Sequence, residues 1–244
     1  MTEALFAVGA GDRVVGSDTS SVYPQAARNM PKVGYQRKLS AEGILSLKPD
    51  IIIGTHEAGP PEVIAQLKAS GVPVVLYEDK GGLEGAYGKI LFAGKHSGNE
   101  DAAQSLVQQM KSHIQGLKRP DFNAKVLFIY ARGPGMVQVS GKGTPAHDMI
   151  ELAGAQNAMN SFQGFRPLTA EALVAANPDI ILIPSRALQS MGGESGLLKV
   201  PGVALTDAGK NRKLVVMDDL LLLGFSARTH IALEELIQKL NRAR

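Results

Sequence analysis

The chain has 244 residues, of which 44% are hydrophobic and 20% charged, and its formal net charge is +3 at pH 7, a balance that is sufficient for a globular protein with a sizeable core. Because cysteine is absent, disulfides, iron–sulfur clusters, thiolate zinc sites and cysteine nucleophiles are excluded. The basic residues are scattered along the chain, so nucleic-acid binding is not expected. The sequence has no apolar stretch of about 18 residues, the length that a membrane-spanning helix requires.

The first half of the chain predicts alternating helices and strands. Ser40 is a good N-cap for a short helix over residues 41–47, and a second helix is expected over residues 61–70. A continuous β-branched run at residues 50–54 predicts a strand that is buried on both faces, and residues 72–77 predict another strand.

A long helix is expected between the two halves of the chain. Apolar residues recur at helical spacing over residues 99–117, Asn99 can cap the helix, and Glu100 and Asp101 lie in its first turn, where the helix dipole favours acids. At 1.5 Å per residue this helix would be nearly 30 Å long, which suits a stiff connection between two lobes.

The second half repeats the pattern of the first. The expected elements are strands over residues 125–130, 179–183 and 214–217 and helices over residues 170–176 and 227–240. Residues 39–45 resemble residues 168–174, with Ser40 and Thr169 as matching N-caps, and both copies continue through Pro-Asp into a strand. Chance similarity of two helix–strand units is the alternative, but the shared register favours a repeat.

These elements predict an α/β fold with two Rossmann-like lobes, each built on a central parallel sheet, joined by one long interlobe helix. The expected boundaries are residues 1–97 for the first lobe, 98–118 for the interlobe helix and 119–244 for the second lobe.

Four segments carry a resemblance to a known family: residues 18–24 (DTSSVYP), 33–43 (VGYQRKLSAEG), 57–61 (EAGPP) and 141–144 (GKGT). With these, the chain resembles haem-binding members of the periplasmic binding proteins that serve haem, siderophore and cobalamin ABC importers. The resemblance implies a periplasmic, monomeric protein that captures haem, receives it downstream of an outer-membrane haem receptor system, and delivers it to a permease dimer.

The same resemblance implies an apolar strand before the first helix of the chain, and a signal peptide before that strand. Met1-Thr2-Glu3 leads directly into helix-like sequence, so we expect the first strand of the first lobe and the signal peptide to be absent from this chain.

The resemblance also implies that Tyr35 is the haem iron ligand. A phenolate is a known axial ligand of ferric haem, and the metal supplies most of the driving force for loss of the phenolic proton. Arg37 could hydrogen-bond the phenolate and weaken its donation to iron, which would favour release. From its position alone, a loop tyrosine would ordinarily be a surface or core aromatic residue.

Further pocket residues follow predicted strands, where α/β sheets bind ligands. Arg132 and Arg186 could each pair with a haem propionate, although either alone could be a solvated loop arginine. Met136 could pack on the porphyrin or face solvent. His56 could line the cleft, and His147 could be an axial ligand, including one for a second haem; a surface histidine is the alternative for both.

Two acids occupy equivalent positions in the repeat. In this class of binding protein, an exposed glutamate on each lobe docks onto arginines of the permease, which implies this role for Glu42 and Glu171. The alternative is that each acid only compensates a helix dipole, worth a few tenths of a kcal/mol. His113 and His230 lie on predicted helices and are expected at the surface.

Two rivals to the haem hypothesis remain open. The first keeps the class but changes the cargo to a ferric siderophore or cobalamin. The second is a cytosolic α/β enzyme, which finds little support because GxSxG, P-loop and HExxH motifs are all missing.

Overall fold

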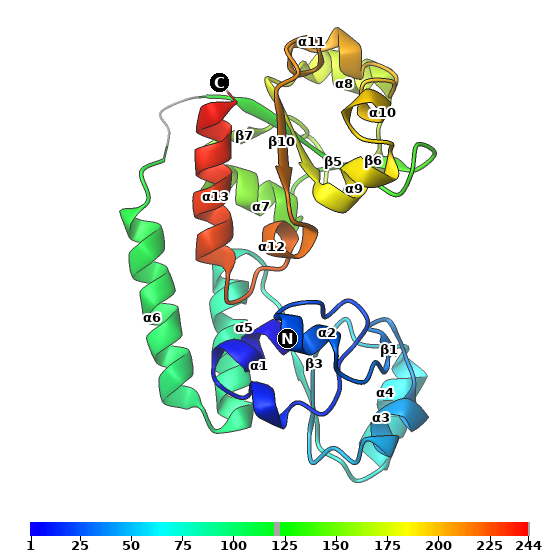
Figure 1. The fold of residues 1–244 in the computed structure, drawn as a ribbon, viewed down its shortest axis with the longest axis vertical. Helices are drawn as coiled ribbons and strands as arrows, with labels where there is room; N and C mark the ends of the chain where they lie inside the picture. Colours follow the sequence, from blue (N-terminus) through cyan, green and yellow to red (C-terminus); the bar gives the residue numbers. More distant parts are fainter. Residues whose placement is uncertain (120–122, 244) are drawn as a thin grey trace. The chain divides into compact units, whose positions relative to one another are not determined.

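The structure is a computed structural model that describes residues 1–119 and 123–243 (Figure 1). The chain divides into two compact units, Met1–Ser112 and His113–Arg244, which are described separately below. Helix α6 (Glu100–Gly116) contains the boundary between them and corresponds to the predicted long helix. Among the described residues, no helix has both the length and the apolar character needed to cross a membrane.

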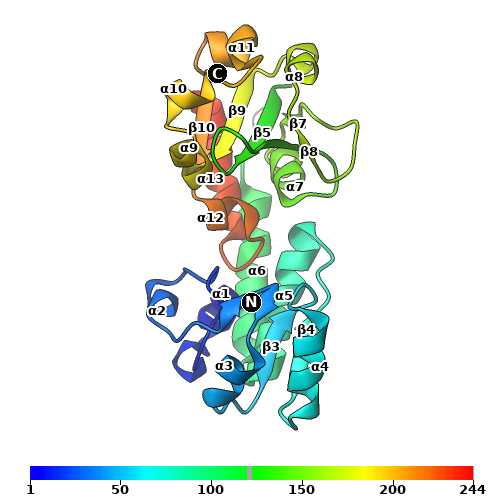
Figure 2. The same cartoon turned by 90° about the vertical axis from the view of Figure 1, so that its right-hand side faces the viewer.

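The first unit is built on a small parallel sheet. Its elements are α1 (Thr2–Ala7), a 3₁₀ turn (Gly11–Arg13), α2 (Gln25–Arg28), β1 (Gly34–Tyr35), β2 (Lys38–Leu39), α3 (Ala41–Ser46), β3 (Ile52–Thr55), α4 (Pro61–Ala69), β4 (Val74–Tyr77) and α5 (Gly82–Ser97). β3 and β4 are parallel, and Ile52 lies opposite Val74. Helix α4 lies beside β4 (Figure 2), and Ile44 of α3 and Leu67 of α4 belong to the core that packs against this sheet.

The prediction that the strand at residues 50–54 is buried on both faces is wrong for this unit. Every residue of β3 is only half-buried, because β4 is its single partner among the described strands. A cavity of about 420 Å³ lies within the same unit and is lined by Leu5, Ile44 and residues 51–53, among others. The apolar run at residues 50–54 therefore forms the predicted strand β3, but only one edge of β3 pairs with another described strand.

The second unit contains a larger sheet. Its elements are β5 (Lys125–Ala131), β6 (Val137–Ser140), α7 (Pro145–Leu152), β7 (Gln156–Asn157), β8 (Phe165–Pro167), α8 (Ala170–Ala176), β9 (Ile180–Pro184), α9 (Ser185–Ser190), α10 (Glu194–Leu197), a 3₁₀ turn (Val203–Leu205), α11 (Asp207–Lys210), β10 (Leu214–Met217), α12 (Asp219–Leu223) and α13 (Thr229–Arg242). The strand order is β10-β9-β5-β6-β8, and β7 also pairs with β5. β10, β9, β5 and β7 are parallel, as predicted, whereas β6 and β8 add an antiparallel extension.

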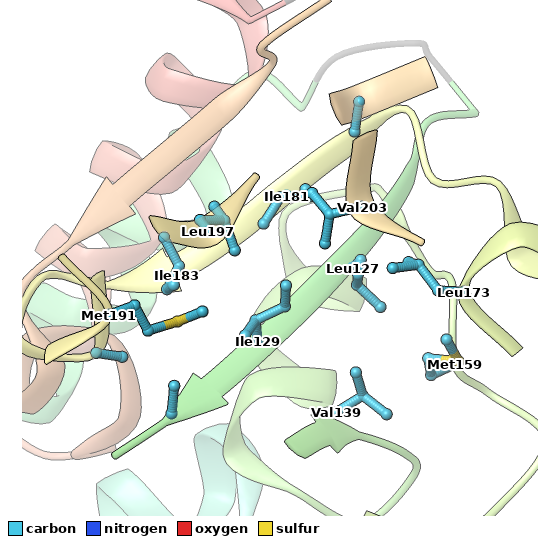
Figure 3. Close-up of a cluster of buried hydrophobic side chains, with 13 residues drawn as sticks. Leu127, Ile129, Val139, Met159, Leu173, Ile181, Ile183, Met191, Leu197 and Val203 are labelled. Atoms are coloured by element: carbon cyan, nitrogen blue, oxygen red, sulfur yellow. The ribbon is translucent and has the colours of Figure 1, made fainter. Parts of the chain in front are cut away.

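The core of the second unit forms on β9, where burial on both faces is confirmed. All five residues of β9 are buried, since the strand lies between β5 and β10. Figure 3 shows Ile181 and Ile183 of β9 beside Leu127 and Ile129 of β5, with Leu173 of α8 completing one end of the cluster. Two copies of one apolar sequence pattern thus end in different environments, because their strands have different numbers of partners.

The two predicted N-caps are confirmed. The Ser40 hydroxyl accepts a hydrogen bond from the Gly43 amide at 3.0 Å, and the Thr169 hydroxyl accepts one from the Ala172 amide at 3.2 Å. Each cap satisfies an amide that the first helical turn leaves unpaired, so both helices begin at the residue that the sequence predicts.

His230 differs from its expected surface position. His113, on α6, remains partly exposed, and its Nε2 lies 2.9 Å from Glu234 Oε2. His230, on α13, is half-buried, and its ring lies 5.1 Å from that of His113. Burial, and secondarily the charge of His113, lowers the pKa of His230 below its ordinary value.

This lowered pKa predicts a loss of stability in mild acid. The unfolded chain takes up the His230 proton at a higher pH than the folded chain, so the free energy of unfolding falls as pH drops below about 6.5. We expect His230→Gln to reduce this dependence, measured by urea unfolding at pH 5.5 and 7.5. Equal pH dependence in wild type and His230→Gln would contradict the prediction.

Candidate functional site

Tyr35 lies on a tight β-hairpin made of β1 and β2. Gly34 pairs with Leu39 and Tyr35 with Lys38, so Gln36 and Arg37 form the turn. Gly34 has φ +105°, and a Cβ there would lie 2.6 Å from the Lys38 carbonyl oxygen, so glycine is required for the hairpin to close. The Tyr35 side chain is 43% exposed, and none of the described residues hydrogen-bonds its hydroxyl.

Two neighbouring segments hold the hairpin in place. The Leu39 amide donates to the Gly59 carbonyl at 2.8 Å, and the Gly59 amide donates to the Gln36 carbonyl at 2.9 Å. On another side, the Thr19 amide donates to the Gly34 carbonyl at 2.9 Å. The backbone that carries Tyr35 is therefore fixed by hydrogen bonds on both sides of the hairpin.

The DTSS segment supports the hairpin through Asp18. The Asp18 carboxylate accepts hydrogen bonds from the Ser20 amide at 2.8 Å and from the Ser21 hydroxyl at 2.5 Å. Burial would raise the pKa of Asp18, but these hydrogen bonds outweigh it and lower the pKa below its ordinary value. The ionised carboxylate thus organises the loop that includes Thr19, which in turn contacts the hairpin.

Arg37 lies next to the site but pairs differently from the expectation. Its guanidinium forms an ion pair with the Glu57 carboxylate rather than a hydrogen bond to Tyr35. Glu57 raises the pKa of Arg37 above its ordinary value, so the guanidinium remains charged. Glu57 was assigned no role from the sequence, although it begins the EAGPP segment that follows β3.

His56 lies at the carboxyl end of β3, next to Glu57 in the chain. Its backbone amide donates to the Tyr77 carbonyl at 2.9 Å, and its Nδ1 is 3.4 Å from the Asp79 amide nitrogen and 4.0 Å from Glu78 Oε2. The first unit therefore brings Tyr35, Arg37 and His56 to one region, linked by Glu57.

In the second unit, Arg132 and Arg186 follow two neighbouring parallel strands, β5 and β9. Both arginines are exposed, and the Gly133 amide ties the turn after β5 to α9 by donating to the Ser190 hydroxyl at 2.9 Å. Carboxyl ends of adjacent parallel strands share one edge, so the two cations lie at the same edge of this sheet. Met136, on the turn after Arg132, is 47% exposed.

Tyr130 is a second residue that the sequence did not single out. Arg132 Nε donates a hydrogen bond to the Tyr130 hydroxyl at 2.8 Å, and the guanidinium carbon lies 5.7 Å from the centre of the Tyr130 ring. The tyrosine is half-buried and lies between the buried residues Ile129 and Ala131 of β5. The Tyr-x-Arg spacing that it shares with Tyr35 and Arg37 could have revealed it.

His147 is half-buried in the first turn of α7. Its Nδ1 lies 3.2 Å from Asn157 Nδ2, which also donates to the Ser140 carbonyl at 2.9 Å, while the Asn157 oxygen accepts from the Met159 amide at 3.0 Å. These contacts fix the amide orientation, so His147 Nδ1 accepts and a neutral ring carries its proton on Nε2.

Glu42 and Glu171 are both exposed in the first turns of α3 and α8. They occupy equivalent positions in the two units, each two residues after a confirmed N-cap. Their carboxylates are therefore accessible on helices that start at fixed points.

Among the residues that the structure describes, there is no group of three or more histidine, aspartate or glutamate side chains that could hold a metal ion.

Comparisons with known proteins agree with this description. The family model described as "Periplasmic binding protein" matches residues 1–221. An ABC transporter substrate-binding lipoprotein of Bacillus subtilis, YvrC, is 31% identical over 206 residues, which are 80% of this chain and 65% of that protein. This chain thus spans just under two thirds of the length of that relative.

Two solved structures are similar over almost the whole chain. The periplasmic heme-binding protein RhuT from Roseiflexus sp. RS-1, in its apo form, has a TM-score of 0.95 and 41% identity and covers 99% of this chain and 95% of that one. The periplasmic heme-binding protein BhuT, in complex with two hemes, has a TM-score of 0.94 and 40% identity, with the same coverage.

Proposed function

The chain belongs to the periplasmic binding protein family, and we propose that it captures haem and delivers it to the permease of an ABC importer. Members of this family bind substrates for transport, so the rival hypothesis of a cytosolic enzyme is wrong. Similar proteins are periplasmic or are substrate-binding lipoproteins, which supports a location outside the cytoplasm; the periplasm itself is our proposal.

The Tyr35 hairpin is the observation that carries the haem hypothesis. Tyr35 is exposed and lies on a backbone that is fixed from two sides, and none of the described residues hydrogen-bonds its hydroxyl. A free phenolic oxygen of this kind can bind ferric iron after it loses its proton. Because the Arg37 guanidinium pairs with Glu57 and makes no hydrogen bond to Tyr35, the Tyr35 hydroxyl remains available for the metal.

The remaining predicted residues supply what haem needs besides a ligand. Arg132 and Arg186 would pair with propionates, because a guanidinium binds a carboxylate through two hydrogen bonds. Met136 would contact the porphyrin and His56 would border it. His147 is less suited to bind iron, because its Nδ1 is engaged by Asn157.

Delivery requires a permease, and we propose that Glu42 and Glu171 dock onto it, one from each unit. We further propose a monomer that acts between an outer-membrane haem receptor system and a permease dimer. Two separate acids on stable helix ends would set the orientation and rate of docking more than its affinity.

Hemin titration of the purified protein tests the proposed function. We expect saturable binding and an absorbance spectrum typical of a ferric high-spin haem with a tyrosinate ligand. Cyanocobalamin and a ferric siderophore, added in excess, should not displace hemin. Tight binding of either one, with no hemin spectrum, would replace haem by the rival cargo of the same class.

A further inference from the structure

The loop over residues 17–27 closes around the side chain of Lys32, which lies just before the Tyr35 hairpin. The Lys32 Nζ atom has four oxygen atoms of this loop within hydrogen-bond distance. They are the Ser17 hydroxyl at 2.9 Å and the carbonyl oxygens of Asp18 at 3.3 Å, Ser21 at 2.9 Å and Ala27 at 2.7 Å. We propose that Lys32 is a positioning residue for Tyr35, because its ammonium group is the cation that holds this loop together beside the hairpin. The inference rests on the proposed haem function and adds a residue to its site.

An ammonium group suits this arrangement of oxygen atoms. It carries three N–H donors and no acceptor, and all four oxygens can accept. The acceptors lie between 5 and 15 residues before Lys32 in the chain, so one side chain joins both ends of the loop. Three carbonyl dipoles also converge on the Nζ position, and without a cation their partial negative charges would repel one another. Loss of the charge is therefore expected to open the loop.

The loop is connected to the hairpin through its backbone. The Thr19 amide donates to the Gly34 carbonyl at 2.9 Å, and Gly34 is the first residue of β1. Lys32 lies two residues before Gly34 and extends this connection to Ser21 and Ala27, which lie further along the loop. Displacement of the loop would move the donor to the Gly34 carbonyl, so we expect the loop and the hairpin to become ordered together.

A direct contact with haem is the other role open to a lysine beside the hairpin. Lys32 is exposed as a whole residue, but its hydrogen bonds to Ser17 and Ala27 are partly buried. Because its three N–H donors already have acceptors in the loop, a propionate would have to displace those oxygens. The contacts of Lys32 therefore favour an effect through the loop.

Chemical rescue tests this role, because a small cation can take the place of the missing ammonium group. Lys32→Ala leaves space for methylammonium, whereas Lys32→Met keeps most of the apolar stem and removes the charge. We expect both variants to bind hemin about 10-fold more weakly than wild type, as for other residues that only position a metal ligand. At equal ionic strength, methylammonium should restore the affinity of Lys32→Ala but not that of Lys32→Met. Tetramethylammonium, which has no N–H donor, should restore neither.

Hydrogen–deuterium exchange measures the effect on the loop in the absence of hemin. Amides of residues 17–27 should exchange faster in Lys32→Ala than in wild type, and methylammonium should reverse the change. Circular dichroism checks that each variant is folded. The matched control is Lys68→Gln, which removes the charge of an exposed lysine on α4 of the same unit and should match wild type in affinity and exchange.

Three outcomes would overturn the role of Lys32. They are unchanged hemin affinity in both variants, unchanged exchange of the loop amides, and equal rescue by tetramethylammonium. If Lys32→Ala did not fold, Lys32→Met would decide through the same affinity and exchange measurements. Failure of the proposed function gives a different pattern: wild type would bind no hemin, while exchange of the loop amides would still depend on Lys32.

Discussion

Replacement of Tyr35 by alanine is expected to weaken hemin binding at the Tyr35 site by more than about 100-fold. Mutation of a residue that only hydrogen-bonds to a metal ligand already lowers metal affinity by about 10- to 100-fold, and Tyr35 is the proposed ligand itself. The phenolic oxygen is the proposed ligand atom of the iron, and alanine has no oxygen that could take its place. The measurement is an absorbance titration with hemin at neutral pH, in which the spectrum of the first bound equivalent of hemin should lose its tyrosinate signature.

Two further variants make this result interpretable. Tyr35→Phe keeps the aromatic ring and removes only the oxygen. It should therefore lose the same equivalent of bound hemin as Tyr35→Ala. Tyr23→Phe, at another exposed tyrosine of the same unit, should bind hemin as wild type does. If Tyr35→Phe retained full affinity and spectrum, the proposed ligand would be wrong, although the family assignment would stand.

Removal of both docking acids is expected to slow haem import by about 10-fold or more while leaving hemin binding unchanged. Glu42 and Glu171 are exposed, one on each unit, so their loss removes both charges that would attract and orient the permease. The measurement is hemin uptake by the importer reconstituted in vesicles, with wild type, each single glutamine variant and the Glu42→Gln/Glu171→Gln double variant. Each single variant should show a partial loss, and added salt should reduce the difference.

A matched control separates docking from a simple effect on the helix dipole. Glu62 is also an exposed acid in the first turn of a helix, α4, and has no proposed partner in the permease. Glu62→Gln should cost the same few tenths of a kcal/mol in stability as the other variants, without slowing import. If the double variant and Glu62→Gln imported haem at equal rates, Glu42 and Glu171 would only compensate the dipoles of their helices and would not dock onto the permease.

Most of the regular elements could be predicted because their signals are local. Ser40 and Thr169 fix where two helices begin, since a hydroxyl accepts from an amide only three residues away. The β-branched runs that became β3 and β9 favour strands wherever they lie. The two-unit repeat and the position of Tyr35 in a loop before a capped helix follow from the same short-range patterns.

Helix α5 was not predicted, because its local signals oppose a helix. Four glycines lie within Gly82–Ser97, and glycine has poor helix propensity. Tertiary packing overrides this: Ile90 is fully buried, and a Cβ at Gly94 would lie 2.4 Å from the side chain of Ala103 on α6. The glycine that weakens the helix is the residue that permits this close approach.

Local sequence thus determined the elements and the caps, and the family resemblance supplied the candidate ligand Tyr35, whereas tertiary structure decided which side chains meet. The sequence placed Arg37 two residues from Tyr35, but its ion pair with Glu57 exists because a loop 20 residues away lies against the hairpin. The half-burial of β3, the full burial of β9 and the antiparallel strands β6 and β8 likewise depend on neighbouring strands. Charge pairs and burial are properties of distances between remote segments, and only the folded chain sets those distances.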